Sequence, residues 1–232
     1  MRLGIAMNGT RWTWARVQCR WGRRIVHAAG EVPAGDWTEL RERAGSVEMV
    51  GVAVPDRAAI VRCVKIGHPP ASREALRQLL RWRLRDDLPF TGGSRLDGQV
   101  EGDQAVVLAV DGAAANAAEQ DAACIAPVRN VTSCSIAAFN AVSPPAADGY
   151  SLLILHDEGH AQFDLSSGII RNVVFRDGAP ARIEGTPSCL DLRIGANPVA
   201  EFPPAEILGI TWAPSIPVSG CARVAAAAGA AP

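Results

Sequence analysis

The stretch from Val50 to Asp97 constrains the fold most, because strand, turn and helix signals follow one another there without interruption. The segment GVAVPDRAAIVRCVKIG, residues 51–67, places two β-rich runs on either side of the turn-forming Pro55-Asp56. Ser72 then begins a helix, and Pro89 ends it because proline cannot donate the next backbone hydrogen bond. This order predicts two strands and a covering helix within an α/β domain.

The predicted helix is amphipathic. Leucines recur at helical spacing on one face, and arginines occupy another; these residues are Leu76, Leu79, Leu80, Leu84 and Leu88, and Arg73, Arg77, Arg81 and Arg85. We expect the leucines to be buried against the strands. The face of Arg77, Arg81 and Arg85 offers several donors for each side chain, which suits an acidic or carboxylate-bearing partner surface.

The composition is that of a folded chain without a strong charge. Of the 232 residues, 48% are hydrophobic and 20% are charged, and the formal net charge is −1. This leaves enough apolar material for one large or two small lobes, and it gives no reason to expect a nucleic acid partner. No apolar run approaches the roughly 20 residues that a membrane helix needs. We therefore expect no direct insertion into a membrane.

The six cysteines are far apart in the sequence, at Cys19, Cys63, Cys124, Cys134, Cys189 and Cys221. No CxxC pair occurs, and no signal peptide precedes them. The pattern favours reduced, mostly buried thiols in the cytosol over a zinc or redox site.

A second candidate for metal or acid–base chemistry is HDEGH, residues 156–160. The metalloprotease signature places its two histidines four residues apart on a helix. Here Asp157, Glu158 and Gly159 have turn chemistry between two apolar strands, so His156 and His160 are predicted to flank a surface hairpin. No GxSxG, Walker or GxGxxG motif occurs in the chain.

The chain divides most naturally at Ser143-Pro144-Pro145, because paired prolines followed by Ala-Ala-Asp-Gly sustain neither helix nor strand. We predict a first lobe over residues 1–143, which holds an inserted subdomain at about 72–143, and a second lobe over residues 148–232. The alanine-rich tail, Val224 to Ala231, is predicted either to dock as a last helix or to fray.

The order of elements resembles a known group of proteins. The segments that carry the resemblance are Val52-Ala53-Val54-Pro55, Ile60-Val61-Arg62-Cys63-Val64, the helix from Ser72, Leu88-Pro89-Phe90 and Leu96-Asp97. They resemble the middle of PilM-type pilus assembly proteins and of the cytoplasmic domains of type II secretion GspL proteins, which are degenerate members of the actin-like superfamily. The resemblance implies an α/β, actin-like (ribonuclease H-like) two-lobe fold with mixed sheets and a shortened second lobe. The alternative is an unrelated α/β domain that holds the same run of elements.

Actin-like ATPases cradle nucleotide phosphates in two hairpin turns, and both are altered here. Where the family has an acidic residue and a glycine, the first turn carries Ala6 and Asn8, followed by Gly9 and Thr10. The second corresponds to His156-Asp157-Glu158-Gly159, which lacks the family's Ser/Thr-Gly cradle. A methyl group cannot organise magnesium, and two carboxylates disfavour a triphosphate. We therefore expect neither a cofactor nor enzymatic activity.

The remaining hypothesis is an interaction protein on an ATPase scaffold. The resemblance implies a cytoplasmic protein held at the inner membrane by a PilN-like bitopic partner, whose N-terminal peptide lies between the first subdomain and the inserted one, with the assembly ATPase as a further partner. The candidate contact residues are Arg62, Arg77, Arg81, Arg85, Leu88, Pro89 and Phe90. Two alternatives stay open, a GspL-like secretion component and an actin-like ATPase or phosphotransferase with unusual loops.

Overall fold

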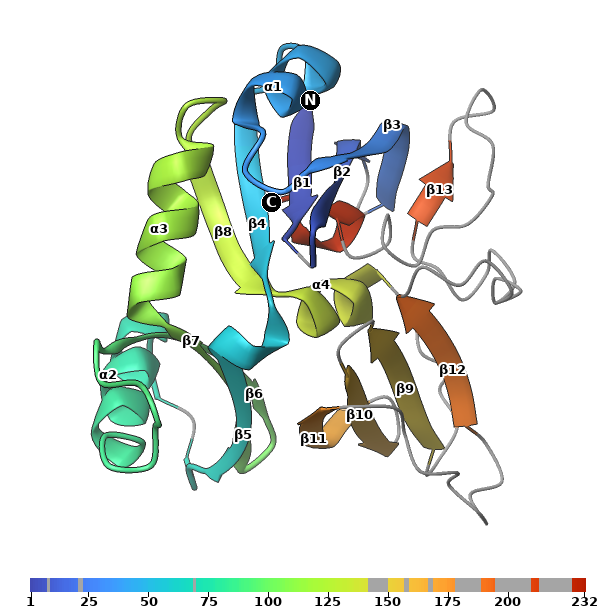
Figure 1. The fold of residues 1–232 in the computed structure, drawn as a ribbon. Coiled ribbons are helices and arrows are strands. Elements are labelled where there is room, and N and C mark those ends of the chain that lie inside the picture. The colour runs from blue at the N-terminus through green and yellow to red at the C-terminus, as the bar shows by residue number, and fades with distance from the viewer. Residues whose placement is uncertain are drawn as a thin grey trace.

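Three β-sheets and the helices between them form the molecule (Figure 1). The computed structural model describes residues 1–7, 9–20, 23–68, 70–141, 150–156, 159–166, 169–177, 189–194, 210–212 and 227–232. Among these residues, no helix is long and apolar enough to cross a membrane.

The first sheet is mixed and has the order β13-β3-β2-β1-β4-β8. Its strands are β1 (Arg2–Ala6), β2 (Arg11–Arg20), β3 (Arg23–Pro33), β4 (Met49–Val54), β8 (Val128–Ser133) and β13 (Ile210–Trp212). β1 is antiparallel to β2 and parallel to β4. Helices α1 (Trp37–Ala44) and α3 (Gly112–Ala122) pack on one face, where Leu40 and Ala115 share a hydrophobic core with the paired residues Ile5 and Val52. Helix α4 (Cys134–Ala141) covers the other face.

The second sheet is an antiparallel insertion after β4, reached through the 3-10 turn η1 (Asp56–Ala58). It has the order β5-β7-β6, from β5 (Ala59–Lys65), β7 (Gln104–Asp111) and β6 (Ser94–Glu101). Helix α2 (Arg73–Arg83) covers its outer face. From the sequence we expected the inserted subdomain to span about residues 72–143. The inserted sheet instead begins earlier, at Ala59, and the chain is back in the first sheet by β8, which pairs with β4.

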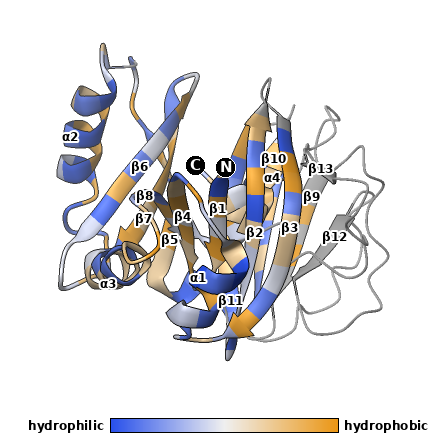
Figure 2. Ribbon diagram, turned by 90° about the horizontal axis from the view of Figure 1, so that it is seen from above, coloured by the Kyte–Doolittle hydropathy of each residue, from blue (hydrophilic) through white to orange (hydrophobic). Residues whose placement is uncertain are grey.

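Helix α2 confirms the predicted amphipathic pattern. Ser72 caps it, with Oγ accepting a hydrogen bond from the N–H of Ala75 at 3.1 Å. Leu76, Leu80 and Leu84 are buried against the sheet. Figure 2 shows the mainly hydrophilic α2 at the periphery and hydrophobic residues along β4.

The predicted end of this helix was wrong. We expected it to continue to Leu88, whereas α2 ends at Arg83 and Leu84 donates the last helical hydrogen bond to Leu80, at 2.9 Å. Asp86 and Asp87 follow at the helix end where the macrodipole disfavours negative charge. The residue before Pro89 is also biased away from helical geometry, so the chain leaves the helix ahead of the proline.

The third sheet has the order β11-β10-β9-β12. Its strands are β9 (Tyr150–His156), β10 (Gly159–Ser166), β11 (Ile169–Asp177) and β12 (Cys189–Ile194). The hairpin predicted around HDEGH is confirmed, because β9 and β10 pair with Leu155 opposite His160. The surface position predicted for His160 was wrong, since this residue is 8% exposed. The predicted boundary at Ser143-Pro144-Pro145 lies outside the described residues.

The alanine-rich tail docks in the centre of the molecule, where residues 227–230 form a helical turn between the first sheet and α4. Glycines allow this contact. A Cβ on Gly4 would lie 1.7 Å from the carbonyl oxygen of Ala227, and one on Gly51 would lie 1.9 Å from that of Ala230. Of the two outcomes expected for the tail, docking is found for these residues.

Candidate partner-binding groove

A groove of about 720 Å³ lies between the inserted sheet and the first sheet, and we call it the inner groove. Its apolar residues come from five strands and two helices: Val61, Leu76, Val100, Val106, Leu108, Val131, Ile136, Phe139 and Ile170. Its polar residues include Ser72, Arg73, Asp97, Gln99, Asn130, Thr132 and Asn140. Such a mixture of an apolar floor and hydrogen-bonding side chains is typical of binding clefts.

Strand register explains which residues of the inserted sheet face the groove. Side chains alternate between the two faces of a strand, and directly paired residues share a face. The row of Val61, Leu108 and Asp97 faces the groove. The next row, which contains Arg62 and Val107, faces the α2 side. Within the described sheets, β6 and β8 are edge strands, and both contribute to the groove.

A charged cluster lies at one end of the groove. The guanidinium of Arg73 donates to Oδ2 of Asp97 at 2.6 Å, and that of Arg77 lies 3.7 Å from Oδ1 of the same carboxylate. Arg77 is partly buried, and its Nε has no hydrogen-bond partner among the described groups. Asp97 thus ties the first two turns of α2 to β6.

The far side of the groove is formed by α4, and Phe139 lies at its centre. The Phe139 ring stacks on the ring of Phe163 in β10, with centroids 4.8 Å apart and an interplanar angle of 15°. Phe163 is fully buried. The groove wall is therefore continuous with the core of the third sheet.

The structure places the predicted contact residues at several separate points. Arg62 lines a different cavity, described below, and Arg77 pairs with Asp97. Arg81 is exposed on α2, and Arg85 lies beyond its end in a shallow hollow beside Trp82. Leu88 and Phe90 pack partly buried on the α2 core, while Pro89 is exposed. The seven residues do not share one groove.

Sequence reasoning missed the residues that form the floor of the inner groove, notably Val106 and Leu108 of β7 and Phe139 of α4. The alternation in β7 was visible in the sequence, but its pairing partners set which alternate residues face the groove. No pattern in the sequence indicated that residues of α4 would line the groove.

The first predicted phosphate turn is packed rather than open at its acidic position. Ala6 is 4% exposed and lies in the core beside Ala53 and Cys134. Gly9 has a φ of 66°, which favours glycine, and Thr10 is exposed. Asn8 lies outside the described residues, as do Asp157 and Glu158 of the second turn. Gly159 begins β10, and nothing is described of the His156 side chain.

The carboxylate of Asp56, just after β4, has a structural partner. It accepts hydrogen bonds from the N–H of Ser135 at 3.0 Å and from Ser135 Oγ at 2.5 Å. These bonds satisfy the first turn of α4, where the macrodipole favours negative charge. Asp56 therefore fixes α4 to the end of β4.

The cysteine prediction was wrong in part. Cys134 is buried, and burial raises the pKa of its thiol well above the usual value, with a further increase from the charge of Asp56. Cys19, Cys63 and Cys124 are free thiols but are exposed. The presence of a cysteine does not by itself predict that its side chain is buried, because so small a side chain also packs well at the edge of a sheet.

Comparison with known proteins relies on structure, since no family model and no curated protein matches the sequence. A PilM-PilN type IV pilus biogenesis complex superposes with a TM-score of 0.62 at 15% identity, covering 75% of this chain and 61% of the other. The cytoplasmic domain of EpsL, an inner membrane component of the Vibrio cholerae type II secretion system, has a TM-score of 0.59 at 16% identity and covers 98% and 93%.

A third similar structure, from Bacteroides thetaiotaomicron, has an actin-like ATPase fold and unknown function, with a TM-score of 0.45 at 7% identity, covering 77% of this chain and 70% of the other. The order of elements between Val50 and Asp97 had predicted the resemblance to the PilM-type and GspL-type proteins. The chain has the α/β actin-like fold with mixed sheets, and it resembles the PilM-type and GspL-type proteins.

Proposed function

We propose that the protein is a non-catalytic, PilM-like cytoplasmic scaffold of a type IV pilus assembly platform at the inner membrane. The inner groove binds the N-terminal cytoplasmic segment of a PilN-like, single-pass membrane partner, and that partner holds the protein at the membrane. The assembly ATPase is a further partner in this proposal. The fold shared with the PilM-PilN complex supports it.

The observation that carries the proposal is the chemistry of the inner groove. Val106, Leu108 and Phe139 offer apolar contact on the floor, and each is only partly buried. The side-chain amide of Asn140 lies beside them and can pair with the backbone of a bound segment, and Asn130, whose Nδ2 donates to the carbonyl oxygen of Ala230 at 3.3 Å, presents its amide oxygen. A short peptide with two or three apolar side chains fits this arrangement.

A non-catalytic role is supported by the residues at the expected phosphate site. Ala6 packs in the core, and the nearby carboxylate of Asp56 is held by Ser135. Calorimetry with ATP and magnesium is expected to give no binding heat. A magnesium-dependent signal at micromolar concentration would instead support the alternative, an actin-like ATPase or phosphotransferase.

A type II secretion role is the second candidate, favoured by one observation. The match to the EpsL domain covers 93% of that chain, whereas the match to the pilus complex covers 61% of its chain. Both roles use a membrane partner, so partner identity separates them. Small single-pass proteins encoded in neighbouring reading frames are the candidates to test.

The groove is tested with a matched pair of substitutions. Gln99 and Gln78 are both exposed glutamines, but only Gln99 lines the inner groove. Gln99→Trp should weaken binding of a synthetic peptide of the partner's tail by about tenfold or more, because the indole fills the groove. Gln78→Trp should bind as the wild type does.

Fractionation tests the same proposal in cells. Deleting the cytoplasmic tail of the membrane partner should release the protein from the membrane fraction. If the protein stays with the membrane, or if both glutamine variants bind the tail peptide equally well, the inner groove is not the recruitment site.

A further inference from the structure

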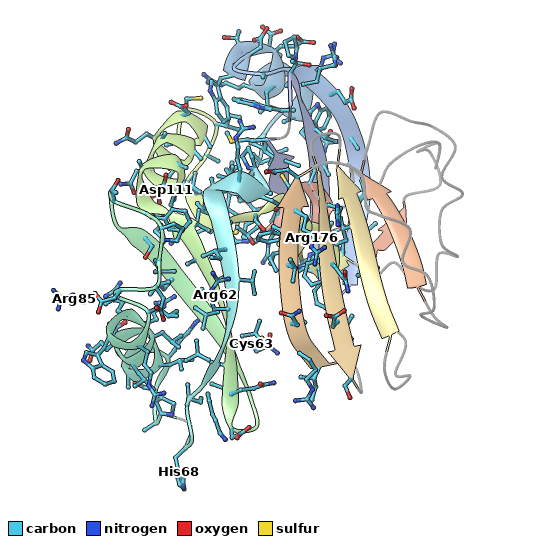
Figure 3. All side chains as sticks on the ribbon, turned by 60° about the horizontal axis from the view of Figure 1, so that its bottom comes forward. Arg62, Cys63, His68, Arg85, Asp111 and Arg176 are labelled. Carbon is cyan, nitrogen blue, oxygen red and sulfur yellow. The ribbon has the colours of Figure 1, made fainter. Side chains whose placement is uncertain are left out.

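A second cavity lies where two sheets meet edge to edge. Among the described strands, β5 is an edge of the inserted sheet and β11 is an edge of the third sheet. They lie side by side without pairing in one ladder, and a cavity of about 780 Å³ runs along them. We call it the seam cleft. Figure 3 shows Arg62 and Cys63 on β5 and Arg176 on β11, on either side of the space between the two strands.

Arginines outnumber carboxylates by one in the lining of the seam cleft. Arg57, Arg62 and Arg176 line it, against the carboxylates of Asp56 and Asp177. The Asp56 carboxylate accepts two hydrogen bonds in the first turn of α4, so it is already engaged there. In a chain with a formal net charge of −1, this local excess of arginine attracts anionic groups.

A further arginine, Arg171, lies on β11 next to the residues that line the cleft. Burial raises the pKa of the Cys63 thiol, and the charge of Arg171 opposes that increase. Arg171 does not line the cleft, but it precedes the lining residue Asn172 on β11. Arg171 and Arg176 are both exposed on β11.

Arg62 lines the cleft from the edge strand β5, although its row of the inserted sheet faces the α2 side. One of its N–H groups donates to the carbonyl oxygen of Val61 at 3.1 Å, and the side chain remains exposed. A guanidinium has five N–H donors, so a carboxylate can still bind it.

Apolar side chains alternate with these polar ones. Ile60 and Val174 are partly buried lining residues, and Phe175 also lines the cleft while packing on the core. A ligand that matches the cleft therefore presents carboxylates to the arginines and apolar groups to the strands. An extended peptide with alternating acidic and apolar residues has this pattern.

We propose that the seam cleft binds an extended acidic segment of a partner protein, whose carboxylates pair with Arg62 and Arg176. The site is separate from the inner groove, and it does not depend on the proposed function. The apolar part of the cleft favours a peptide over a nucleic acid, whose outer surface is a continuous row of phosphates.

The binding test uses a fluorescein-labelled peptide of alternating glutamate and valine, about ten residues long to match a strand. Fluorescence anisotropy at low and high salt should show saturable, salt-sensitive binding. The double variant Arg62→Glu and Arg176→Glu should weaken it by about tenfold or more, as expected when charge-assisted pairs are reversed. Arg41→Glu with Arg129→Glu makes the same charge change at two exposed positions outside the seam cleft and the inner groove, and it should leave the binding unaltered.

Two outcomes overturn the proposal in this experiment. Equal losses in both double variants would show attraction to overall charge only. Equal affinity for oligo-dT and for the acidic peptide would show a site that takes any polyanion. If the glutamate variant does not fold, Arg62→Gln with Arg176→Gln replaces it, with the same expected direction.

Cysteine footprinting tests the location. Cys63 lines the seam cleft, whereas Cys19 and Cys124 are exposed thiols elsewhere and serve as internal standards. Saturating acidic peptide should slow alkylation of Cys63, measured by mass spectrometry, and leave the two standards unchanged. Binding without protection of Cys63 would place the peptide elsewhere and overturn the assignment.

Discussion

Two helical segments pack on their sheets by opposite means. α2 fills the outer face of the inserted sheet with large side chains, and Leu80 is fully buried there. Residues 227–231 pack on the first sheet with alanines and a glycine, and they approach its backbone at Gly4 and Gly51. In the first contact, large leucine side chains fill the space between helix and sheet. In the second, the two backbones lie so close together that little space remains to fill.

The comparison has a consequence for stability. A leucine core loses stability when a side chain is shortened, because a cavity remains. A glycine–alanine contact loses stability when a side chain is lengthened, because nothing can move aside except the backbone. The two regions should therefore respond to opposite kinds of substitution.

The largest effect is expected from Leu80→Ala in the α2 core. Removing a fully buried leucine side chain should lower the free energy of unfolding by about 2 to 5 kcal/mol. Urea denaturation followed by circular dichroism measures this. Leu79→Ala, at a partly buried position, is the matched control and should cost clearly less. Equal costs would mean that the α2 core is loosely packed.

The next effect is expected from Gly51→Ala under the docked tail. The new methyl group would lie 1.9 Å from the carbonyl oxygen of Ala230, so the tail must shift, at a cost of about 1 to 3 kcal/mol. Gly92→Ala is the control, since its Cβ would meet only the Ala113 methyl at 4.0 Å. Thermal unfolding separates the two. An unaltered melting temperature for Gly51→Ala would show that the tail is not docked in solution.

A smaller effect is expected at the start of α2. Ser72→Ala removes the side-chain acceptor for the N–H of Ala75, and should cost about 1 kcal/mol. Ser72→Asp keeps an acceptor at the cap and should retain most of the stability. Amide hydrogen exchange in the first turn of α2 is the direct measurement, and faster exchange is expected only for the alanine variant.

The smallest stability effect is expected from Arg81→Glu together with Arg85→Glu. Both side chains are exposed, so the melting temperature should change little, by an amount equivalent to less than about 0.5 kcal/mol. If this face docks an acidic partner, as predicted from the sequence, capture of the assembly partner in a pull-down should weaken. Unfolding of the double variant would instead show that these arginines form internal structural pairs.

The sequence predicted α2 and its neighbours well, because leucine spacing and the Ser72 cap are local signals. It did not predict the glycine–alanine contact as such. Gly4, Gly51 and Ala230 are far apart in the sequence. Glycine and alanine occur in every kind of secondary structure, so their presence does not predict a close backbone contact. The resemblance implied a groove between the first subdomain and the inserted one, but the residues that line the inner groove were missed, since Asn130, Gln99 and Phe139 meet only through the tertiary fold.

Phe139 belongs to two surfaces at the same time. One side of its ring lines the inner groove, and it stacks on Phe163 within the third sheet. Packed aromatic rings transmit displacement, because the interior is too dense to absorb it. A segment that pushes on this ring from the groove thereby acts on β10, so an occupied groove and an empty one should differ in the second lobe as well as at the binding site.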